Sequence, residues 1–484
     1  VLPLLLLLLL GSSPTTWATD DEHEFITVSD KSSLKSHAAC SVAHRVTVIP
    51  PHRGAWAPLY RHLGPCSPSA SAPAPAAKTE PSVADLLRRD QLRVDHIHWR
   101  LSEDARGSVD RKPVGFEAAH LHDEPVIQVT LGSAKSNSDG GQSSRRGVVQ
   151  TVVLDTASDV PWVRCAPSCP VPPCHPETAD SSSAAFFDPT RSGTYSAVAC
   201  GSPDCEQLGR LYGDGCGADN QCRYRVQRVF GSFTSSGTYS SDHLTINSAS
   251  PVPGFLFWCS RAEQGSFERQ AGGVMALGRG SQSLTAQTSS TFGDAFSYCL
   301  PPSETAKGFF RLGVPGGAAD RFVMTPMLRD RREDVGDPTL YRARLVGITV
   351  DGRPLNVVPD VFAAGTVLDS RTVITRLPLT AYGALRAAFR DRMAHRAAPP
   401  QEELDTCYDL RGVRYPRVPR VALVFDGNAV VELDRSGVLF NSCLAFASND
   451  DDASPSILGN VQQQTIEVLH DVGGRRIGFR RAAC

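Results

Sequence analysis

Val152-Val153-Leu154-Asp155-Thr156 and Val367-Leu368-Asp369-Ser370 are two matched stretches of one chain. In each of them, an apolar run ends in an aspartate, and a residue with a hydroxyl group follows. A run of this kind predicts a buried strand that holds its terminal carboxylate at the edge of a sheet. Two such strands, far apart in the sequence, predict two β lobes that each present one carboxylate.

The two carboxylates, Asp155 and Asp369, carry a specific chemistry if the fold brings them together. Neighbouring like charges cannot both ionise easily, so the pair would share one proton. The ionised member would act as a base on water, and the protonated member would donate to a carbonyl oxygen. A single Asp-Thr pair is most often a turn or a helix cap, but the matched strands favour hydrolysis of peptide bonds.

The sequence after residue 124 reads as short strands separated by Gly, Pro, Ser and Asp. The expected strands are Val126–Leu131, Val148–Leu154, Tyr239–Ile246, Leu345–Val350, Val421–Phe425 and Ile466–Leu469. Within this region, only Ala381–Ala394 has a clear helical pattern. The 40 glycines and 35 prolines also favour many turns. These features predict an all-β protein.

Composition narrows the class of protein further. The 484 residues include 49 Lys+Arg and 51 Asp+Glu, a formal charge of −2 that implies no nucleic-acid partner. The 14 cysteines favour an oxidising compartment, where disulfides form. A zinc site at Cys165, Cys169, Cys174 and His175 is the alternative for that cluster, and disulfides are the preferred interpretation.

The N-terminal region resembles a targeting segment followed by a linker and a helix. Leu4 to Leu10 form an apolar run that is too short to span a bilayer, which predicts a signal peptide over residues 1–18. The expected location is the secretory pathway and then the extracellular space, with the vacuole or plastid as alternatives. We expect no membrane contact after the signal peptide is removed.

Residues 19–115 are predicted to be a pro-segment. A helical pattern between residues 81 and 106 places Leu86, Leu87, Leu92, Val94 and Ile97 among many arginines and aspartates. Two interpretations are open: a solvated helix, or a removable segment whose basic residues pair with acidic groups in a cleft.

Further motifs make the chain resemble the pepsin-type aspartic proteases, and in particular their plant nepenthesin-like branch. These motifs are His52-Arg53, Gly64-Pro65-Cys66-Ser67-Pro68, Trp162-Val163-Arg164-Cys165, Phe187-Asp188-Pro189, Ser297-Tyr298-Cys299-Leu300-Pro301, Leu404-Asp405-Thr406-Cys407-Tyr408 and Ile457-Leu458-Gly459-Asn460-Val461. The resemblance implies the bilobal pepsin-like fold of two β-barrel-like lobes with the cleft between them, here residues 116–320 and 321–484, the first with a cysteine-rich insertion.

The resemblance also implies roles for individual residues. Asp155 and Asp369 match the catalytic pair. Thr156 and Ser370 match residues that hydrogen-bond across the pair, and Ser158 and Thr372 match supporting hydroxyls. The expected partner is an extended peptide or protein substrate in the cleft of a monomer, and no cofactor or metal is expected.

Four positions depart from the family pattern. Ala157 and Arg371 replace the glycine that follows each Asp-Thr/Ser pair, Arg228 stands at the tyrosine position of the flap, and Ala276 replaces a glycine behind Asp155. Glycine at such a turn permits backbone angles that a β-carbon resists. Arg371 is expected either to pair with the two aspartates or to point to solvent and leave them displaced.

The sequence therefore supports two functions. The first is an aspartic endopeptidase, whose activity the altered positions could impair. The second is a non-catalytic pepsin-like protein that binds a protein or peptide, as a binding module or an inhibitor.

Overall fold

The computed structural model describes residues 54–62, 64–68, 82–102, 124–133, 147–166, 186–211, 213–227, 234–264, 271–313, 321–328 and 340–484. All of these residues belong to one compact unit, Lys35–Cys484. The predicted signal peptide, the flap position Arg228, and Cys169 and Cys174 lie outside the described residues.

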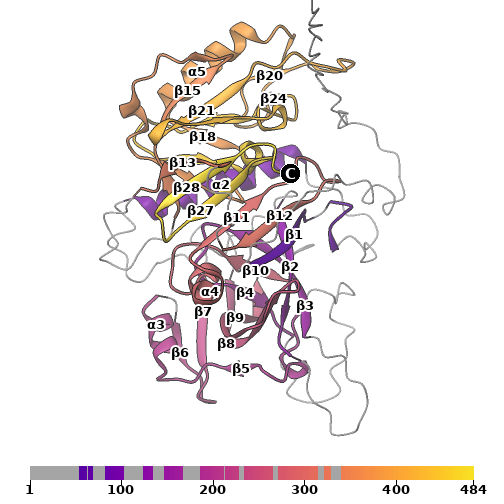
Figure 1. Cartoon of the computed structure of the whole chain (residues 1–484), viewed down its shortest axis with the longest axis vertical. Helices are drawn as coiled ribbons and strands as arrows, with labels where there is room; N and C mark the ends of the chain where they lie inside the picture. Colours follow the sequence, from indigo (N-terminus) through magenta and orange to yellow (C-terminus); the bar gives the residue numbers. More distant parts are fainter. Residues whose placement is uncertain are drawn as a thin grey trace, which may run out of the picture. The chain divides into compact units, whose positions relative to one another are not determined.

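The largest sheet has the strand order β13-β28-β27-β11-β12-β1-β2-β3-β10-β4-β9-β8-β7-β6, and β5 pairs with β8. Its strands are β1 (Ala55–Arg61), β2 (Pro125–Leu131), β3 (Val148–Asp155), β4 (Trp162–Arg164), β5 (Ser196–Ala197), β6 (Gly213–Cys216), β7 (Cys222–Gln227), β8 (Thr234–Ile246), β9 (Val252–Gln264), β10 (Gly273–Ala276), β11 (Ala295–Cys299), β12 (Gly308–Leu312), β13 (Val323–Pro326), β27 (Glu467–Asp471) and β28 (Arg476–Arg480). The C-terminal strand β27 pairs with β11, so the end of the chain closes onto its middle (Figure 1).

Three smaller sheets form in the C-terminal half. Their strand orders are β14-β17-β26-β18-β25, β16-β15-β21-β22 and β19-β20-β24-β23. The strands are β14 (Arg342–Ala343), β15 (Leu345–Val350), β16 (Arg353–Pro354), β17 (Thr366–Leu368), β18 (Thr375–Leu377), β19 (Ala397–Ala398), β20 (Cys407–Tyr408), β21 (Val421–Phe425), β22 (Ala429–Glu432), β23 (Leu439–Phe440), β24 (Cys443–Leu444), β25 (Phe446–Ser448) and β26 (Ser456–Leu458). The predicted all-β, bilobal class is confirmed.

Helices are few among the described residues. The α-helices are α2 (Val83–Leu101), α3 (Pro203–Leu211), α4 (Leu284–Phe292), α5 (Leu379–Arg392) and α6 (Asn460–Gln463), and the short 3₁₀ turns are η5 (Pro189–Arg191), η7 (Pro359–Phe362), η8 (Asp426–Asn428) and η9 (Arg435–Gly437). The predictions for 81–106 and 381–394 are confirmed as α2 and α5. Helices α3 and α4 were not predicted from the sequence, because each has only 9 residues and so spans few helical turns.

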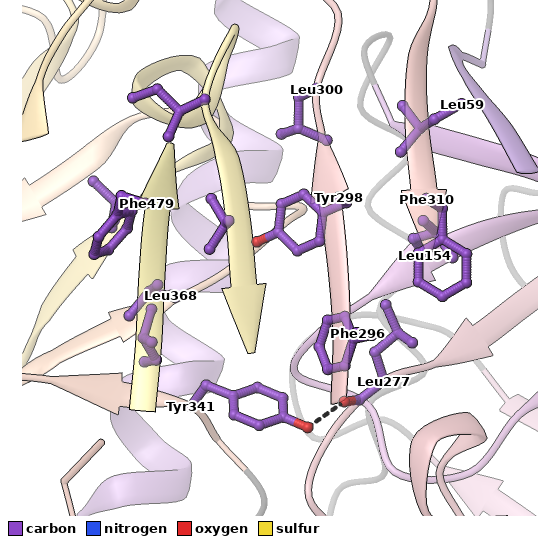
Figure 2. Close-up of a cluster of buried hydrophobic side chains, with 14 of the residues drawn as sticks. Leu59, Leu154, Leu277, Phe296, Tyr298, Leu300, Phe310, Tyr341, Leu368 and Phe479 are labelled. Carbon is purple, nitrogen blue, oxygen red and sulfur yellow. Dashed lines mark hydrogen bonds between the residues drawn. The ribbon is translucent and has the colours of Figure 1, made fainter. Parts of the chain in front are cut away.

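The core joins residues from both halves of the chain. Phe296 and Tyr298 on β11 pack near Leu277 and Tyr341 (Figure 2), and the Tyr341 hydroxyl donates a 2.8 Å hydrogen bond to the Leu277 carbonyl. Leu154 and Leu368, which precede the two aspartates, belong to the same buried cluster. This shared core fixes the strand ends that carry the two carboxylates.

The predicted pro-segment contributes two elements to the fold. Strand β1 lies in the interior of the large sheet, because it pairs with β12 through Ala55–Leu59 and with β2 through Tyr60 and Arg61. Helix α2 begins with a capping box, in which the Ser82 side chain accepts from the Asp85 amide and Asp85 accepts from the Ser82 amide. Removal of residues 19–115 stays a prediction.

Disulfides connect cysteines throughout the described chain, and none of its cysteines is free. The pairs are Cys165–Cys259, Cys200–Cys216, Cys205–Cys222, Cys299–Cys484 and Cys407–Cys443. Because its sulfur is bonded to Cys259, Cys165 cannot serve as a zinc thiolate. The disulfide interpretation of the cluster is therefore correct for Cys165, and the zinc alternative is wrong there.

Candidate active site

Two equivalent strand ends carry the aspartates. Asp155 is the last residue of β3, whose parallel partner β10 places Ala276 opposite it. Asp369 directly follows β17, whose parallel partner is β26, and its amide donates to the Leu458 carbonyl over 3.2 Å. Both aspartates are 0% exposed.

Hydrogen bonds between Thr156 and Ser370 tie the two strand ends together. The Thr156 amide donates to Ser370 Oγ over 3.2 Å, and the Ser370 amide donates to Thr156 Oγ1 over 3.0 Å. Each hydroxyl also donates to a carbonyl of the opposite strand, Thr156 to Leu368 and Ser370 to Leu154. The structure therefore brings together the two residues that the sequence analysis placed across the pair.

Each carboxylate also has local donors. Asp155 accepts from the Ala157 amide and from Ser158 Oγ, each over 2.9 Å. Asp369 accepts from the Thr372 amide over 2.9 Å and from Thr372 Oγ1 over 2.5 Å. Hydrogen bonds to an ionised carboxylate stabilise it and limit its rotation.

Arg93 of helix α2 binds both aspartates. Its Nη2 lies 2.9 Å from Asp155 Oδ1 and 2.6 Å from Asp369 Oδ1, and its Nε donates to Asp369 Oδ2 over 2.6 Å. One nitrogen atom is thus within hydrogen-bond distance of both carboxylates. The two Oδ1 atoms converge on a single point, which is the geometry that a shared water would need.

Asp90, one helical turn before Arg93, binds α2 to the chain that follows Asp369. Asp90 accepts from the amides of Val373 and Ile374, over 2.7 and 3.2 Å, and lies 3.3 Å from a guanidinium nitrogen of Arg376. Burial raises the pKa of Asp90, although Arg376 opposes this effect.

The apolar side of α2 is buried in two clusters. Leu86 and Leu87 belong to one with Val373 and Ile374, and Val94 and Ile97 belong to another with Ala157. The helix therefore covers the region of the two aspartates with a continuous buried face.

Arg371 forms a second cationic contact with Asp155. Its Nη1 donates to Asp155 Oδ2 over 2.8 Å, while its Nε and Nη2 donate to Glu124 Oε1 over 3.0 and 2.5 Å. Arg371 and Glu124 are each 2% exposed. The structure pairs Arg371 with one of the two aspartates, Asp155, and the expectation that Arg371 points to solvent is wrong.

The charges at the site nearly balance. Asp155, Asp369 and Glu124 supply three carboxylates, while Arg93 and Arg371 supply two guanidiniums. Burial alone would raise the pKa of Asp155, but the combined charges of Arg93 and Arg371 hold it well below its usual range. The same negative partners, Glu124 and Asp155, raise the pKa of Arg371 despite its burial. The two arginines therefore favour the ionised form of Asp155.

Ala157 and Arg371 fit into their turns without the positive φ that favours glycine. Neither Ala157 nor Arg371 is among the described non-glycine residues with positive φ. The expectation that these turns need glycine angles is therefore wrong for this chain. Ala276 is fully buried next to Asp155, whereas its counterpart Gly459 is confined, because a β-carbon there would lie 2.6 Å from the Val373 carbonyl oxygen.

Sequence reasoning missed three residues of the site by name. It expected basic residues in the region of α2 but did not single out Arg93, and it did not identify Glu124 or Asp90. The helical spacing of Asp90, Arg93, Val94 and Ile97 was the available signal, since residues three and four apart share a face. In the described part of the chain, no group of three or more His, Cys, Asp and Glu could hold a metal ion.

The chain is similar in sequence to known protein families and to individual plant proteins. Residues 143–314 match the family model described as xylanase inhibitor N-terminal, and residues 340–481 match that described as xylanase inhibitor C-terminal. An aspartyl protease family protein from Arabidopsis thaliana is 34% identical over 422 residues, covering 84% of this chain and 83% of the relative. Aspartic proteinase nepenthesin-2 from Nepenthes gracilis is 29% identical over 361 residues, covering 69% and 74%.

Solved structures share the fold at lower identity. Basic 7S globulin from soybean superimposes with a TM-score of 0.54 at 20% identity, covering 74% of this chain and 91% of the globulin. Conglutin gamma from lupine seeds superimposes with a TM-score of 0.55 at 19% identity, with the same coverages.

Proposed function

Since the chain belongs to the plant pepsin-like aspartic protease family, we propose that it is an aspartic endopeptidase precursor whose catalytic pair is closed by helix α2. One observation carries the proposal: Arg93 Nη2 lies within hydrogen-bond distance of Oδ1 of both aspartates. The nitrogen takes the place where a water bound to both carboxylates would lie. The precursor is inactive as long as Arg93 is docked there.

The reaction follows from the unequal environments of the two carboxylates. Once α2 has left, Arg371 still favours the ionised form of Asp155, which then takes a proton from the shared water. The water oxygen attacks the carbonyl carbon of the peptide bond, and the protonated Asp369 donates its proton to the carbonyl oxygen. When the C–N bond breaks, the nitrogen takes the proton now held by Asp155 and leaves as an amine. A hydroxyl of the tetrahedral diol returns a proton to Asp369 as the diol becomes a carboxyl group, so the pair is again singly protonated.

Glu124 makes Arg371 compatible with this chemistry. A guanidinium next to two carboxylates would otherwise favour the doubly ionised pair, which lacks the proton that the carbonyl oxygen requires. Because Glu124 accepts two hydrogen bonds from the same guanidinium, its charge offsets that of Arg371. The combined charge of Arg371 and Glu124 beside the two aspartates is therefore close to zero.

The substrate class and the compartment follow from the same features. An extended peptide would occupy the cleft that α2 fills, with the scissile bond at the two aspartates. The disulfides agree with a route through the secretory pathway. No helix in the described ranges is long and apolar enough to cross a membrane.

A second function has its own supporting observation. The ion pair between Arg371 and Asp155 remains after α2 departs, because both residues lie outside the predicted pro-segment. If this cation prevents sharing of the proton, the protein binds peptides or proteins in its cleft without cutting them.

The two functions are separated by a cleavage assay on the full chain. An unfolded protein substrate is incubated at pH 3 to 6, in the presence and absence of pepstatin. Three proteins are compared: the unmodified chain, Asp155→Asn, and the double variant Ala157→Gly/Arg371→Gly. Pepstatin-sensitive cleavage by the unmodified protein after loss of α2, absent in Asp155→Asn, is the expected result. Cleavage by the double variant Ala157→Gly/Arg371→Gly but not by the unmodified protein would favour the second function. If all of these proteins fold and none of them cleaves the substrate, the first function is overturned.

A further inference from the structure

Seven arginines gather at one end of the sheet β16-β15-β21-β22, in the C-terminal half of the chain. They form what we call the basic face: Arg353, Arg392, Arg396, Arg411, Arg414, Arg417 and Arg420. The backbone brings them together, because Val350 pairs with both Arg353 and Val421. This face carries none of the residues of the candidate active site.

Two aspartates link the arginines to one another. Asp351 accepts from the Arg420 amide over 2.9 Å and lies 3.7 Å from Arg392 Nε. Asp409 forms hydrogen bonds of 2.8 and 2.7 Å with the Arg411 guanidinium, and its amide donates to the Arg396 carbonyl. These contacts hold the loop over residues 410–420 against the end of α5.

The arginines outnumber the acids on this face. Besides Asp351 and Asp409, the neighbouring carboxylates are Asp391 on α5, Glu432, which lies 4.0 Å from Arg420, and Asp434, which follows the residue that pairs with Val421. Seven guanidiniums beside five carboxylates leave an excess of positive charge, although the whole chain has a formal charge of −2. Local concentration of one sign attracts an oppositely charged ligand even when the net charge does not.

The loop presents two of these arginines without a carboxylate. Arg414 and Arg417 are exposed, and no acidic group of the described residues lies within ion-pair distance of either. Buried Val418 and Pro419 anchor the loop. Between the two arginines, Tyr415 is 64% exposed, and Arg414 lies 5.8 Å from its ring centre. A flat aromatic ring beside the guanidinium of Arg414 is thus exposed to solvent.

We propose that the basic face binds an acidic polysaccharide whose sugars carry carboxylates, such as a chain of uronates. The planar guanidinium fork matches a carboxylate in two-point hydrogen bonds, and the apolar face of a sugar ring can cover the Tyr415 ring. The disulfides place the protein in an oxidising compartment, where such polymers occur and nucleic acids are not the expected polyanions. The proposal is independent of catalysis at Asp155 and Asp369.

The test measures binding of the full chain to four polymers at 50 and 200 mM salt: polygalacturonate, dextran sulfate, single-stranded DNA and neutral dextran. The test variant is Arg414→Gln/Arg417→Gln. The control, Arg191→Gln/Arg321→Gln, removes the same charge from exposed positions outside the basic face. Circular dichroism and unfolding temperatures show whether both variants are folded.

We expect polygalacturonate to bind, with an affinity that falls as salt rises, and dextran not to bind. The test variant should bind polygalacturonate about tenfold more weakly at 50 mM salt, and the control should match the unmodified protein. No binding of polygalacturonate, or equal loss in both variants, would overturn the proposal. Tighter binding of dextran sulfate or DNA would assign the face to sulfate or phosphate groups and would also overturn it.

Discussion

Arg371 donates a 2.8 Å hydrogen bond from Nη1 to Oδ2 of Asp155, and both side chains are buried. The pair joins the turn after the second aspartate to the first aspartate. Arg93 reaches the same carboxylate from helix α2, in the predicted pro-segment. Arg93 therefore leaves the site if helix α2 departs, whereas Arg371 remains beside Asp155.

The first prediction concerns the pH profile of Arg371→Gly. Arg371 lowers the pKa of Asp155, so its removal raises that pKa toward the usual range. A carboxyl that ionises at higher pH serves as a base only at higher pH, so the acidic limb of the cleavage profile should move upward by about 1 pH unit or more. The measurement is kcat/KM for a peptide substrate between pH 2 and 7 after loss of α2.

The exposed arginine at position 321 gives the control, Arg321→Gly, which should leave the profile unchanged. An unchanged or downward-shifted profile for Arg371→Gly would contradict the role of Arg371 in favouring the ionised form of Asp155.

The second prediction concerns His470, which makes the fold sensitive to acid. The centre of its ring lies 4.4 Å from that of Phe296, both ring nitrogens lack a hydrogen-bond partner among the described residues, and burial lowers its pKa to about 3. The unfolded chain binds a proton at His470 below about pH 6.5, but the folded protein does not until about pH 3. The free energy of unfolding therefore falls as the pH drops through this window, by up to about 4 kcal/mol from this residue.

His470→Leu should remove that part of the slope of unfolding free energy against pH, measured by chemical denaturation between pH 3 and 7. The half-buried His395 provides a control, His395→Leu, that should retain it. An unaltered slope in His470→Leu would show that the imidazole is protonated in the folded state or reaches solvent.

The third prediction concerns Gly459, behind Asp369. A β-carbon at this position would lie 2.6 Å from the Val373 carbonyl oxygen and 2.9 Å from the Ile374 carbonyl carbon, both of which belong to the backbone. Gly459→Ala should therefore lower the free energy of unfolding by about 1 to 3 kcal/mol. Denaturant unfolding at neutral pH measures the change.

Gly383 in the middle of α5 is the matched control, because a β-carbon there meets nothing within 4 Å. Gly383→Ala should stabilise the protein by about 0.5 to 1 kcal/mol, since alanine favours the helix. If both substitutions change the free energy of unfolding in the same direction, the close packing behind Asp369 does not limit the residue at position 459.

The sequence was sufficient for those parts of the fold that local patterns determine. Apolar runs that end in Asp155 and Asp369 predicted β3 and β17, and the hydroxyls of Thr156 and Ser370 were expected to link them, as they do. Helix α5 was predicted from its 3.6-residue period, and the oxidised cysteines were predicted from their number.

The contacts around the dyad were not predictable in the same way. Glu124 meets Arg371 across a large sequence separation, and no local pattern marks such a partner. The backbone angles at Ala157 and Arg371 also differ from the expectation, because the fold places both turns outside the region of positive φ. Arg93 was one basic residue among several on its helix, and only the docking of α2 distinguishes it.

The proposal that Arg93 of helix α2 keeps the two aspartates inactive is tested most directly by comparing Arg93→Ala with Arg88→Ala. Both substitutions remove an arginine from α2, but Arg93 is buried against Asp155 and Asp369, whereas the Arg88 side chain is 65% exposed and pairs only with Asp85 of its own helix among the described residues. The measurement is the initial rate of pepstatin-sensitive peptide cleavage by the intact, uncleaved chains at pH 4 to 5. We expect Arg93→Ala to cleave the peptide at least about tenfold faster than the unmodified chain. The cleavage rate of Arg88→Ala should equal that of the unmodified chain. Equal rates for a folded Arg93→Ala and the unmodified chain would contradict it.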